Sequence, residues 1–288
     1  MRAIKAVLAL MICALVLGGC DGMIWQERDR RPPPESPNTL NDIAWDVDER
    51  LGYTVYILED GEYAPYLVLT NDFNGSGNVL LLRQYLLDEL RAYRYLDERG
   101  HFGVGVVASY YEDSAIDDFL NSEFYDKLPL YVMNKIIDST IRITAIESIG
   151  IGGHRTISIY RKIFLLSWIE VNGNVGRHMS RINVSEGTEL EYFSERGLRI
   201  AYHSNGEAGN WWLRTPSIAD MNVVAVVTYT GMTGNAPINQ LVRADITRGE
   251  RAVVEALAGV RPAFCLPRDT PIKERELNGE MVFVLDLG

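Results

Sequence analysis

Residues 211–230, WWLRTPSIADMNVVAVVTYT, hold two short apolar runs that are separated by turn residues. The runs Trp211 to Arg214 and Val223 to Thr230 have the length and composition of β-strands. Three further runs of this kind follow, each bounded by Gly, Pro or Asn: Leu241 to Ile246, Val260 to Leu266 and Met281 to Leu287. The second half of the chain therefore predicts strands that pair mainly in antiparallel fashion.

The first half of the globular part combines strands with helices. Tyr53 to Leu58, Asp60-Gly61 and Tyr66 to Thr70 predict a hairpin. Ala115 to Tyr125 predicts a helix that Ser114 caps, with Asp117 completing a capping box. We also expect helix within residues 88–100 and 250–258, and one central strand over residues 157–169. The expected fold class is α+β, a mostly antiparallel sheet with its helices in the N-terminal half.

Four acids crowd the start of the predicted helix: Glu112, Asp113, Asp117 and Asp118. Acidic side chains at a helix N-terminus are stabilised by the helix dipole and by capping, which explains them without a metal. A calcium or magnesium site is the alternative, because both ions prefer oxygen ligands. We favour the first interpretation and predict no metal site.

The N-terminal residues resemble a bacterial lipoprotein signal. Arg2 and Lys5 precede the apolar run Ala6 to Leu17, and Leu17-Gly-Gly-Cys20 resembles the cleavage and lipid-attachment box. We therefore expect a signal peptide over 1–19, lipid on Cys20, a proline-rich tether over 20–42 and a single globular domain over 43–288. The expected location is the extracytoplasmic face of the cell membrane, although an ordinary secretory signal that is cut nearby is the alternative.

Charge and cysteine content limit the possible partners. The chain of 288 residues has a formal charge of −11, and loss of Arg2 and Lys5 with the signal changes it to −13. Such an acidic protein is not expected to bind nucleic acid. The chain contains three cysteines, of which Cys13 leaves with the signal and Cys20 carries lipid, so Cys265 has no partner for a disulfide.

Four ordered blocks resemble the bacterial family called domain of unknown function 6273. They are Tyr111-Glu-Asp-Ser114 with Phe119-Leu-Asn-Ser-Glu-Phe-Tyr125, Ile163-Phe-Leu-Leu-Ser167, Trp211-Trp-Leu-Arg-Thr-Pro-Ser217 and Gly259-Val-Arg-Pro-Ala-Phe264. The resemblance spans roughly residues 53–266 and implies a surface or secreted module without an established activity. More remotely, it implies a fold like that of C-type lectins and the formylglycine-generating enzyme. Ser217 stands where the family usually has glycine, and the segment before Gly259 is longer than expected.

The aromatic strand allows two interpretations. Alternation places Trp211 and Leu213 on one side and Trp212 and Arg214 on the other. In the favoured interpretation both sides are packed and Arg214 pairs with an acid. In the other, Trp212 and Arg214 form with Tyr229 and Asn235 a ligand-binding set at one sheet end. For Arg261, which lies in an apolar strand, we expect a buried or edge ion pair.

No sequence motif for catalysis is present. The chain lacks H-E-x-x-H, G-x-S-x-G, a phosphate-binding loop and paired C-x-x-C, and its four histidines lack ligand spacing. We expect a lipid-anchored cell-surface module that binds a glycan, peptide or surface partner without catalysis or a cofactor. The alternatives are an envelope enzyme that cleaves wall polysaccharide through carboxylates such as Glu112, Asp113 or Glu207, or a structural envelope lipoprotein.

Overall fold

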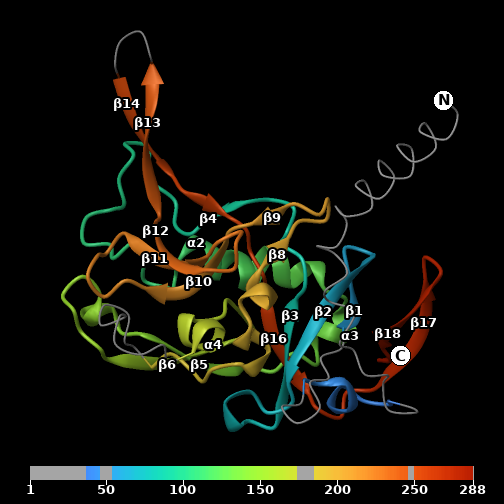
Figure 1. The fold of residues 1–288 in the computed structure, drawn as a ribbon. Helices are drawn as coiled ribbons and strands as arrows, with labels where there is room; N and C mark the ends of the chain where they lie inside the picture. The colour runs from blue at the N-terminus through green and yellow to red at the C-terminus, as the bar shows by residue number, and fades with distance from the viewer. Residues whose placement is uncertain (1–36, 46–53, 174–184, 246–249, 288) are drawn as a thin grey trace, which may run out of the picture.

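A computed structural model describes residues 37–45, 54–173, 185–245 and 250–287 (Figure 1). The predicted signal peptide, the lipid site at Cys20 and most of the predicted tether lie outside these ranges. Strands make up most of the regular structure, and the helices are short. The expected α+β class with antiparallel pairing is therefore confirmed at this coarse level.

The largest sheet has seven strands in the order β17-β18-β1-β2-β3-β16-β7. All neighbours pair antiparallel except β1 and β18, which are parallel. Its strands are β1 (Thr54–Glu59), β2 (Glu62–Thr70), β3 (Asn78–Arg83), β7 (Ile163–Phe164), β16 (Ala263–Pro267), β17 (Ile272–Leu277) and β18 (Glu280–Leu285). The last part of the described chain thus pairs with the first.

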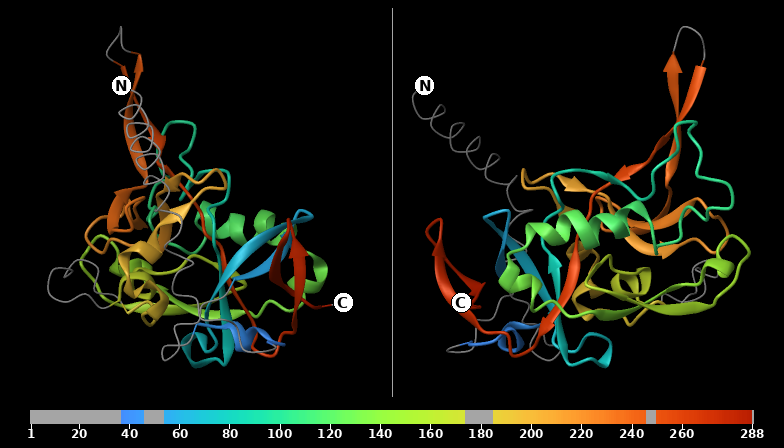
Figure 2. Two further views of the ribbon diagram at one scale, coloured as in Figure 1. Left: turned by 45° about the vertical axis from the view of Figure 1, so that its right-hand side comes forward. Right: turned by 180° about the vertical axis from the view of Figure 1, so that it is seen from behind.

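The other strands form a three-stranded sheet and four two-stranded pairs. The sheet consists of β10 (Trp211–Pro216), β11 (Val223–Val227) and β12 (Thr233–Pro237). The pairs are β5 (Ser139–Thr144) with β6 (Thr156–Arg161), β4 (Arg91–Ala92) with β15 (Leu257–Ala258), β8 (Ala201–Tyr202) with β9 (Ala208–Gly209), and β13 (Asn239–Asp245) with β14 (Glu250–Glu255). The β13–β14 pair stands clear of the rest of the molecule in every view (Figures 1 and 2).

The helical segments contain three to five residues each. They are α2 (Ala115–Phe119), α3 (Leu130–Met133) and α4 (Trp168–Asn172), the π-helical turn η4 (Leu120–Phe124), and the 3₁₀ turns η2 (Leu40–Ile43), η3 (Phe73–Gly75), η5 (Tyr125–Lys127), η6 (Ile146–Ser148), η7 (Glu191–Ser194) and η8 (Arg196–Arg199). The segments α2, η4 and η5 follow one another without a break. Among the residues that the structure describes, no helix has the length and apolar character needed to span a bilayer.

The first hairpin confirms its sequence prediction. Asp60 and Gly61 both have positive φ, 49° and 88°, and connect Glu59 directly to Glu62. Two central residues with positive φ match the right-handed twist of the flanking strands, which is why Asp-Gly is favoured there. The buried residues Val55 and Ile57 alternate with less buried neighbours along β1, as expected of a strand that packs one face on the core.

Strand β10 lies in the core and is buried at all six positions. The Trp212 ring meets Tyr93 edge-on at 5.8 Å between centroids. On the other side, Trp211 packs against Phe193 at 6.5 Å and beneath the guanidinium of Arg261 at 4.9 Å. Both sides of the strand are therefore covered by side chains from distant parts of the chain.

The two additional helices expected from the sequence are wrong. Within residues 88–100 the structure has bends and the short strand β4, and residues 250–258 form β14 and β15. In β4 and β15, Ala92 pairs with Leu257 and Arg91 with Ala258. Strand β14 pairs along its length with β13. Pairing between residues far apart in sequence has overridden the local helix propensity at both places.

The single central strand expected over residues 157–169 is also wrong. The chain forms β6, then the short strand β7 at the edge of the large sheet, and then α4. Residues Ile163 to Leu166 are nevertheless buried. Burial explains the uninterrupted apolar run. A buried strand and a buried segment that leads into a helix have the same apolar sequence pattern, so the pattern alone cannot distinguish them.

Candidate functional site

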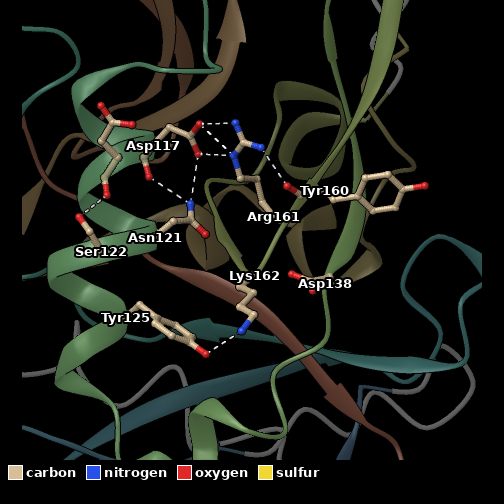
Figure 3. Close-up of a pocket in the computed structure, with 9 residues that line it drawn as sticks. Asp117, Asn121, Ser122, Tyr125, Asp138, Tyr160, Arg161 and Lys162 are labelled. Carbon is tan, nitrogen blue, oxygen red and sulfur yellow. Dashed lines mark hydrogen bonds and ion pairs between the residues drawn. The ribbon is translucent and has the colours of Figure 1, made fainter.

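An open pocket of about 690 Å³ lies between the helical segment 115–127 and strands β6 and β7 (Figure 3). This volume lies within the range of small-molecule sites, about 300–1,000 Å³. The pocket is lined by nine residues, of which seven are polar or charged and two are tyrosines: Asp117, Asp118, Asn121, Ser122, Tyr125, Asp138, Tyr160, Arg161 and Lys162. Its walls belong to elements that are packed on the core.

Asp117 and Arg161 form the ion pair that joins the two walls. Arg161 Nε donates to both oxygens of Asp117 at 2.9 and 3.0 Å, and Nη2 donates to Oδ2 at 2.8 Å. Burial raises the pKa of Asp117, whose side chain is 3% exposed, and the adjacent guanidinium opposes part of that rise. The carboxylate also accepts from Asn121 Nδ2 at 3.2 Å and from the backbone N–H of Asp113 at 3.3 Å. Asp117 is therefore fully engaged with the protein.

The cap of this helix confirms half of the predicted capping box. Ser114 Oγ accepts from the Asp117 N–H at 3.2 Å, as expected of an N-cap serine. The Asp117 carboxylate points instead to Arg161 on the facing strand, and the Ser114 N–H donates to Tyr111 O at 3.0 Å. The Asp117 carboxylate is thus engaged in the ion pair with Arg161, and the contact to the Ser114 N–H that would complete a capping box is not made.

Asn121, in the π-helical turn, joins the helical wall to the edge of the large sheet. Its Nδ2 donates to Ile163 O at 2.9 Å, and its Oδ1 accepts from Ile163 N–H at 3.1 Å. One side-chain amide thus satisfies both backbone groups of a residue in the edge strand β7, as a neighbouring strand would. Single π-helical turns occur frequently at functional sites, and this one fixes the wall of the pocket.

Lys162 and Tyr125 meet at the lower end of the pocket as drawn in Figure 3. The Lys162 ammonium donates to the Tyr125 hydroxyl at 2.8 Å, and the Tyr125 O–H donates to Met133 O at 3.2 Å. The hydrogen bond to Tyr125 raises the pKa of Lys162, and the negative charge of Asp138 adds to this effect against the cost of desolvation. Lys162 is thus held in its charged form on the pocket wall.

The four residues of the predicted ligand-binding set do not form one surface. Trp212 is 1% exposed and donates through Nε1 to Arg91 O at 2.8 Å, and Arg214 is fully buried. Tyr229, by contrast, is 61% exposed in the turn after β11, and Asn235 is exposed on β12. A ligand on this surface can reach Tyr229 and Asn235 but not the other two.

Arg214 lies instead at the centre of a buried network. Its guanidinium donates to both Glu170 oxygens at 2.6 and 2.7 Å and to the backbone oxygens of Leu165, Arg142 and Glu186 at 2.7, 3.1 and 2.6 Å. The charge of Glu170 offsets the effect of burial and raises the pKa of Arg214. The packed arrangement, with Arg214 paired to an acid, is the one that the structure has.

Glu186 adds a second buried carboxylate to this network. It accepts from the N–H and the hydroxyl of Thr144, both at 2.5 Å, and from the hydroxyl of Thr215. Burial raises the pKa of Glu186, and the charge of Arg214 and these hydrogen bonds only partly oppose the rise. The Arg214 network thus ties together β5, β10, α4 and the chain that returns at residues 185–187.

The ion pair expected for Arg261 is absent from the part of the chain that the structure describes. Arg261 is 2% exposed, donates from Nε to Arg83 O at 3.0 Å, and stacks on Trp211, while Nη1 has no hydrogen-bond partner. Burial lowers its pKa to about 10. The cation is stabilised by an aromatic face and a carbonyl dipole in place of an acid.

The residues of the enzymatic alternative are not gathered in one place. Glu112 accepts from the Tyr110 hydroxyl at 2.8 Å and from Arg161 Nη2 at 3.4 Å, next to the pocket. Asp113 is exposed with a φ of 59°, and Glu207 lies in the turn between β8 and β9 and does not line the pocket. Within the described ranges, no group of three or more His, Cys, Asp or Glu side chains is arranged to hold a metal ion.

Cys265 and Ser217 are both in ordinary environments. Cys265 is buried in β16, and burial raises the pKa of its thiol to about 12, so it is a poor nucleophile at neutral pH. Ser217 stands where the resembling family usually has glycine, but its φ is not positive. The backbone at this position therefore does not require glycine.

Sequence reasoning missed most of the pocket. It singled out Asp117 and Asp118 because acids cluster at a helix start, but it assigned no role to Asn121, Tyr125, Arg161 or Lys162. Arg161 and Lys162 precede a buried apolar run, which by itself indicates no binding site. Only the packing of β6 against the helical segment brings them close to Asp117 and Tyr125. The one available signal was the run of three consecutive polar residues, Tyr160, Arg161 and Lys162, that interrupts an otherwise apolar segment.

Comparison with protein families gives one clear result. The model of the family described as Domain of unknown function (DUF6273) matches residues 76–268, about two thirds of the chain. The match includes the helical wall of the pocket, strands β6 and β7, and the Arg214 network. Neither the comparison with curated proteins nor the comparison with solved structures produced a match. The family match alone is sufficient, and the chain belongs to the DUF6273 family.

Proposed function

We propose that this protein is a lipid-anchored module on the extracytoplasmic face of the membrane, and that it binds a glycan, peptide or surface partner in the pocket between the helical segment 115–127 and β6–β7. One observation carries the proposal. The walls of the pocket are joined to the core by hydrogen bonds, while the exposed carboxylates of Asp118 and Asp138 have no hydrogen-bond or ion-pair partner among the described residues. Rigid walls with unsatisfied polar groups suit ligand binding, because little ordering is needed when the ligand arrives.

The state of Asp117 favours binding over catalysis. A general acid or base must exchange a proton with the reacting group, and this requires a free position on the carboxylate. Both oxygens of Asp117 already accept hydrogen bonds from Arg161, and other protein donors occupy the remaining positions. This carboxylate positions the wall of the pocket and has no position left for a substrate.

One observation favours the enzymatic alternative. Glu112 and Asp117 both contact Nη2 of Arg161, at 3.4 and 2.8 Å, so two carboxylates lie close together beside the pocket. Paired carboxylates at short separation are the requirement of a retaining glycosidase. Incubation of the protein with cell-wall polysaccharide and an assay for new reducing ends tests this alternative. Release by the wild type but not by Glu112→Gln would replace the binding proposal.

The membrane anchor is a separate part of the proposal and has its own test. Cells that express the protein are labelled with radioactive palmitate. We expect label in the wild type and in Cys265→Ala, and none in Cys20→Ala, because lipid is attached at Cys20. Equal labelling of Cys20→Ala would exclude the anchor but would leave the pocket proposal intact.

The C-type-lectin-like fold remains a hypothesis that rests on the remote resemblance of the sequence. It is compatible with the mixed antiparallel strands and short helices. An experimental structure of the protein, superposed on C-type lectin domains, tests it. Lack of a common strand order would refute the relationship without affecting the pocket.

Binding itself is tested with the detergent-solubilised full-length protein. The protein is applied to a glycan array and used to retain partners from an envelope extract, beside a Lys162→Met/Asp138→Asn variant. We expect a ligand that the wild type retains and the variant loses, with unchanged far-UV circular dichroism. Equal retention by both proteins would place the site elsewhere, and a structural lipoprotein would retain nothing selectively.

A further inference from the structure

The unsatisfied groups of the pocket indicate the chemistry of its ligand. Arg161, Asn121 and the Tyr125 hydroxyl are engaged with other protein groups. The carboxylates of Asp118 and Asp138 are exposed, and no hydrogen bond or ion pair links them to a side chain in the described part of the protein. A ligand in the pocket therefore meets two free acceptors and, on Lys162, an ammonium with one of its three N–H donors in use.

Hydroxyl groups of a ligand can bind both the carboxylate acceptors and the ammonium donors of the pocket. A hydroxyl donates to a carboxylate and accepts from an ammonium, so one kind of ligand group satisfies Asp118, Asp138 and Lys162. Hydrogen bonds in which one partner is ionised are about twice as strong as those between neutral groups. A ligand rich in hydroxyls thus gains several strong contacts without bringing a charge into the pocket.

Charged ligands fit less well. A ligand carboxylate or phosphate would face Asp118 and Asp138, and repulsion between two unit charges about 4 Å apart near a protein surface is of the order of 4 kcal/mol. A ligand ammonium could pair with Asp118 or Asp138, but it would be repelled by Lys162, which is held in its charged form, and it has no acceptor for the free N–H groups of Lys162. The chain as a whole carries a formal charge of −11, which adds to the disadvantage of an anion.

Tyr160 extends the site beyond the pocket. Its ring is 69% exposed and points away from the helical wall, at the outer edge of the pocket (Figure 3). An exposed aromatic face offers a large apolar contact surface to the C–H groups of a sugar ring. A ligand that contacts both Asp118 and the Tyr160 ring therefore extends from the pocket onto its outer edge.

We infer that the pocket takes a neutral oligosaccharide. Its hydroxyls contact Asp118, Asp138 and Lys162, and one of its sugar rings lies against Tyr160. This inference rests on the proposed function, because it names the ligand class of the same pocket.

Isothermal titration calorimetry on the full-length protein in detergent tests the inference with named probes. The neutral probes are cellotriose, maltotriose and chitotriose, and the acidic probe is trigalacturonate. We expect at least one neutral trisaccharide to bind and trigalacturonate to bind at least tenfold more weakly. Asp138→Asn and Tyr160→Ala should each weaken neutral binding about tenfold, equivalent to about 1.4 kcal/mol.

Matched controls separate the site from general effects on the fold. Asp126→Asn makes the same change as Asp138→Asn at an exposed acid of the helical segment 115–127, and Tyr95→Ala removes another exposed tyrosine, but neither residue lines the pocket. Both controls should bind like the wild type. If a control weakens binding as much as its partner variant, the placement of the ligand is wrong.

The outcomes also separate this inference from the proposed function. Tighter binding of trigalacturonate than of any neutral probe overturns the inference but leaves a binding module. Absence of binding for all four probes overturns the inference as well, and the pull-down then decides whether the module binds a peptide or protein. If the pull-down also retains nothing, both proposals fail.

Discussion

Replacing Arg214 by methionine should strongly destabilise the protein. The side chain is fully buried, and its guanidinium bonds both oxygens of Glu170 and three backbone carbonyls. Methionine has a similar length but no donor. Arg214→Met therefore leaves Glu170, fully buried as well, without its cation and leaves carbonyl oxygens without donors.

The magnitude follows from the loss of one partner of a buried pair. Removal of one member of a buried ion pair costs about 3–5 kcal/mol, mainly because the remaining charge is uncompensated. For a domain of this size, each kcal/mol lowers the midpoint of thermal unfolding by roughly 2–4 °C. We therefore expect the midpoint of thermal unfolding to fall by roughly 6–20 °C. The underlying loss of about 3–5 kcal/mol is a large part of a typical free energy of unfolding of about 5–15 kcal/mol.

A second variant isolates the uncompensated charge. In Arg214→Met/Glu170→Gln the acid is neutral, yet the glutamine oxygen can still accept from the Ser167 N–H at the start of α4. We expect this double variant to recover about 1–3 kcal/mol relative to Arg214→Met, within the usual range of coupling energies.

The assay is unfolding in urea followed by tryptophan fluorescence, with thermal unfolding by circular dichroism. The control is Arg142→Met, which removes an exposed arginine from β5 and should change stability by less than about 0.5 kcal/mol. If Arg214→Met were no more destabilising than Arg142→Met, Arg214 would not be the centre of a buried network, and Trp212 and Arg214 would again be candidates for a ligand platform.

Three further predictions concern other buried features. Burial raises the pKa of Glu186, so its contribution to stability is complete below the pKa of an unfolded glutamate, about 4.3, and is lost as pH rises through the folded pKa. As the pH is raised above that unfolded value in urea titrations, Glu186→Gln should lose less stability than the wild type, and equal losses would contradict this. Gly231→Ala should destabilise by more than about 1 kcal/mol, because φ is +76° and a Cβ would clash with the Arg196 carbonyl, whereas Gly234→Ala has open space and should be nearly neutral in the same assay. The Cys265 thiol, with a pKa of about 12, should resist a thiol-reactive dye until urea unfolds the protein; rapid labelling of the folded protein would show that the sheet opens at β16.

Local patterns predicted the elements whose structure depends on neighbouring residues. Asp60-Gly61 specified a two-residue turn, and the apolar alternation of Val55 and Ile57 placed β1 on the core. Ser114 began a helix for the expected reason. In each case the decisive interaction lies within a few residues in sequence, which is the range over which propensity and capping act.

Long-range pairing explains what could not be predicted. Residues 250–255 contain good helix formers, yet they pair with β13, and Arg91–Ala92 pair with Leu257–Ala258 from the far end of the chain. The pocket depends on the same kind of information, since Asp117 and Arg161 are 44 residues apart in sequence. Nothing in the sequence near either residue specifies that the other will face it.

The sequence blocks that carry the family resemblance divide between two structural roles. Tyr111 accepts from the Leu165 N–H at 3.1 Å, Arg214 donates to Leu165 O, and the Trp212 N–H donates to Gly259 O at 3.1 Å, so parts of all four blocks meet in one buried region.

Phe119 to Tyr125 is the exception, because it supplies three residues that line the pocket: Asn121, Ser122 and Tyr125. The blocks that contain Trp212 and Arg214 therefore mark a packing centre, which a ligand outside the protein cannot reach. Among the four blocks, only the segment 119–125 supplies residues that line the pocket. If members of this family share a binding function, it should involve this helical segment and the strand ends that face it, and substitutions there should alter ligand binding without the loss of stability expected for Arg214.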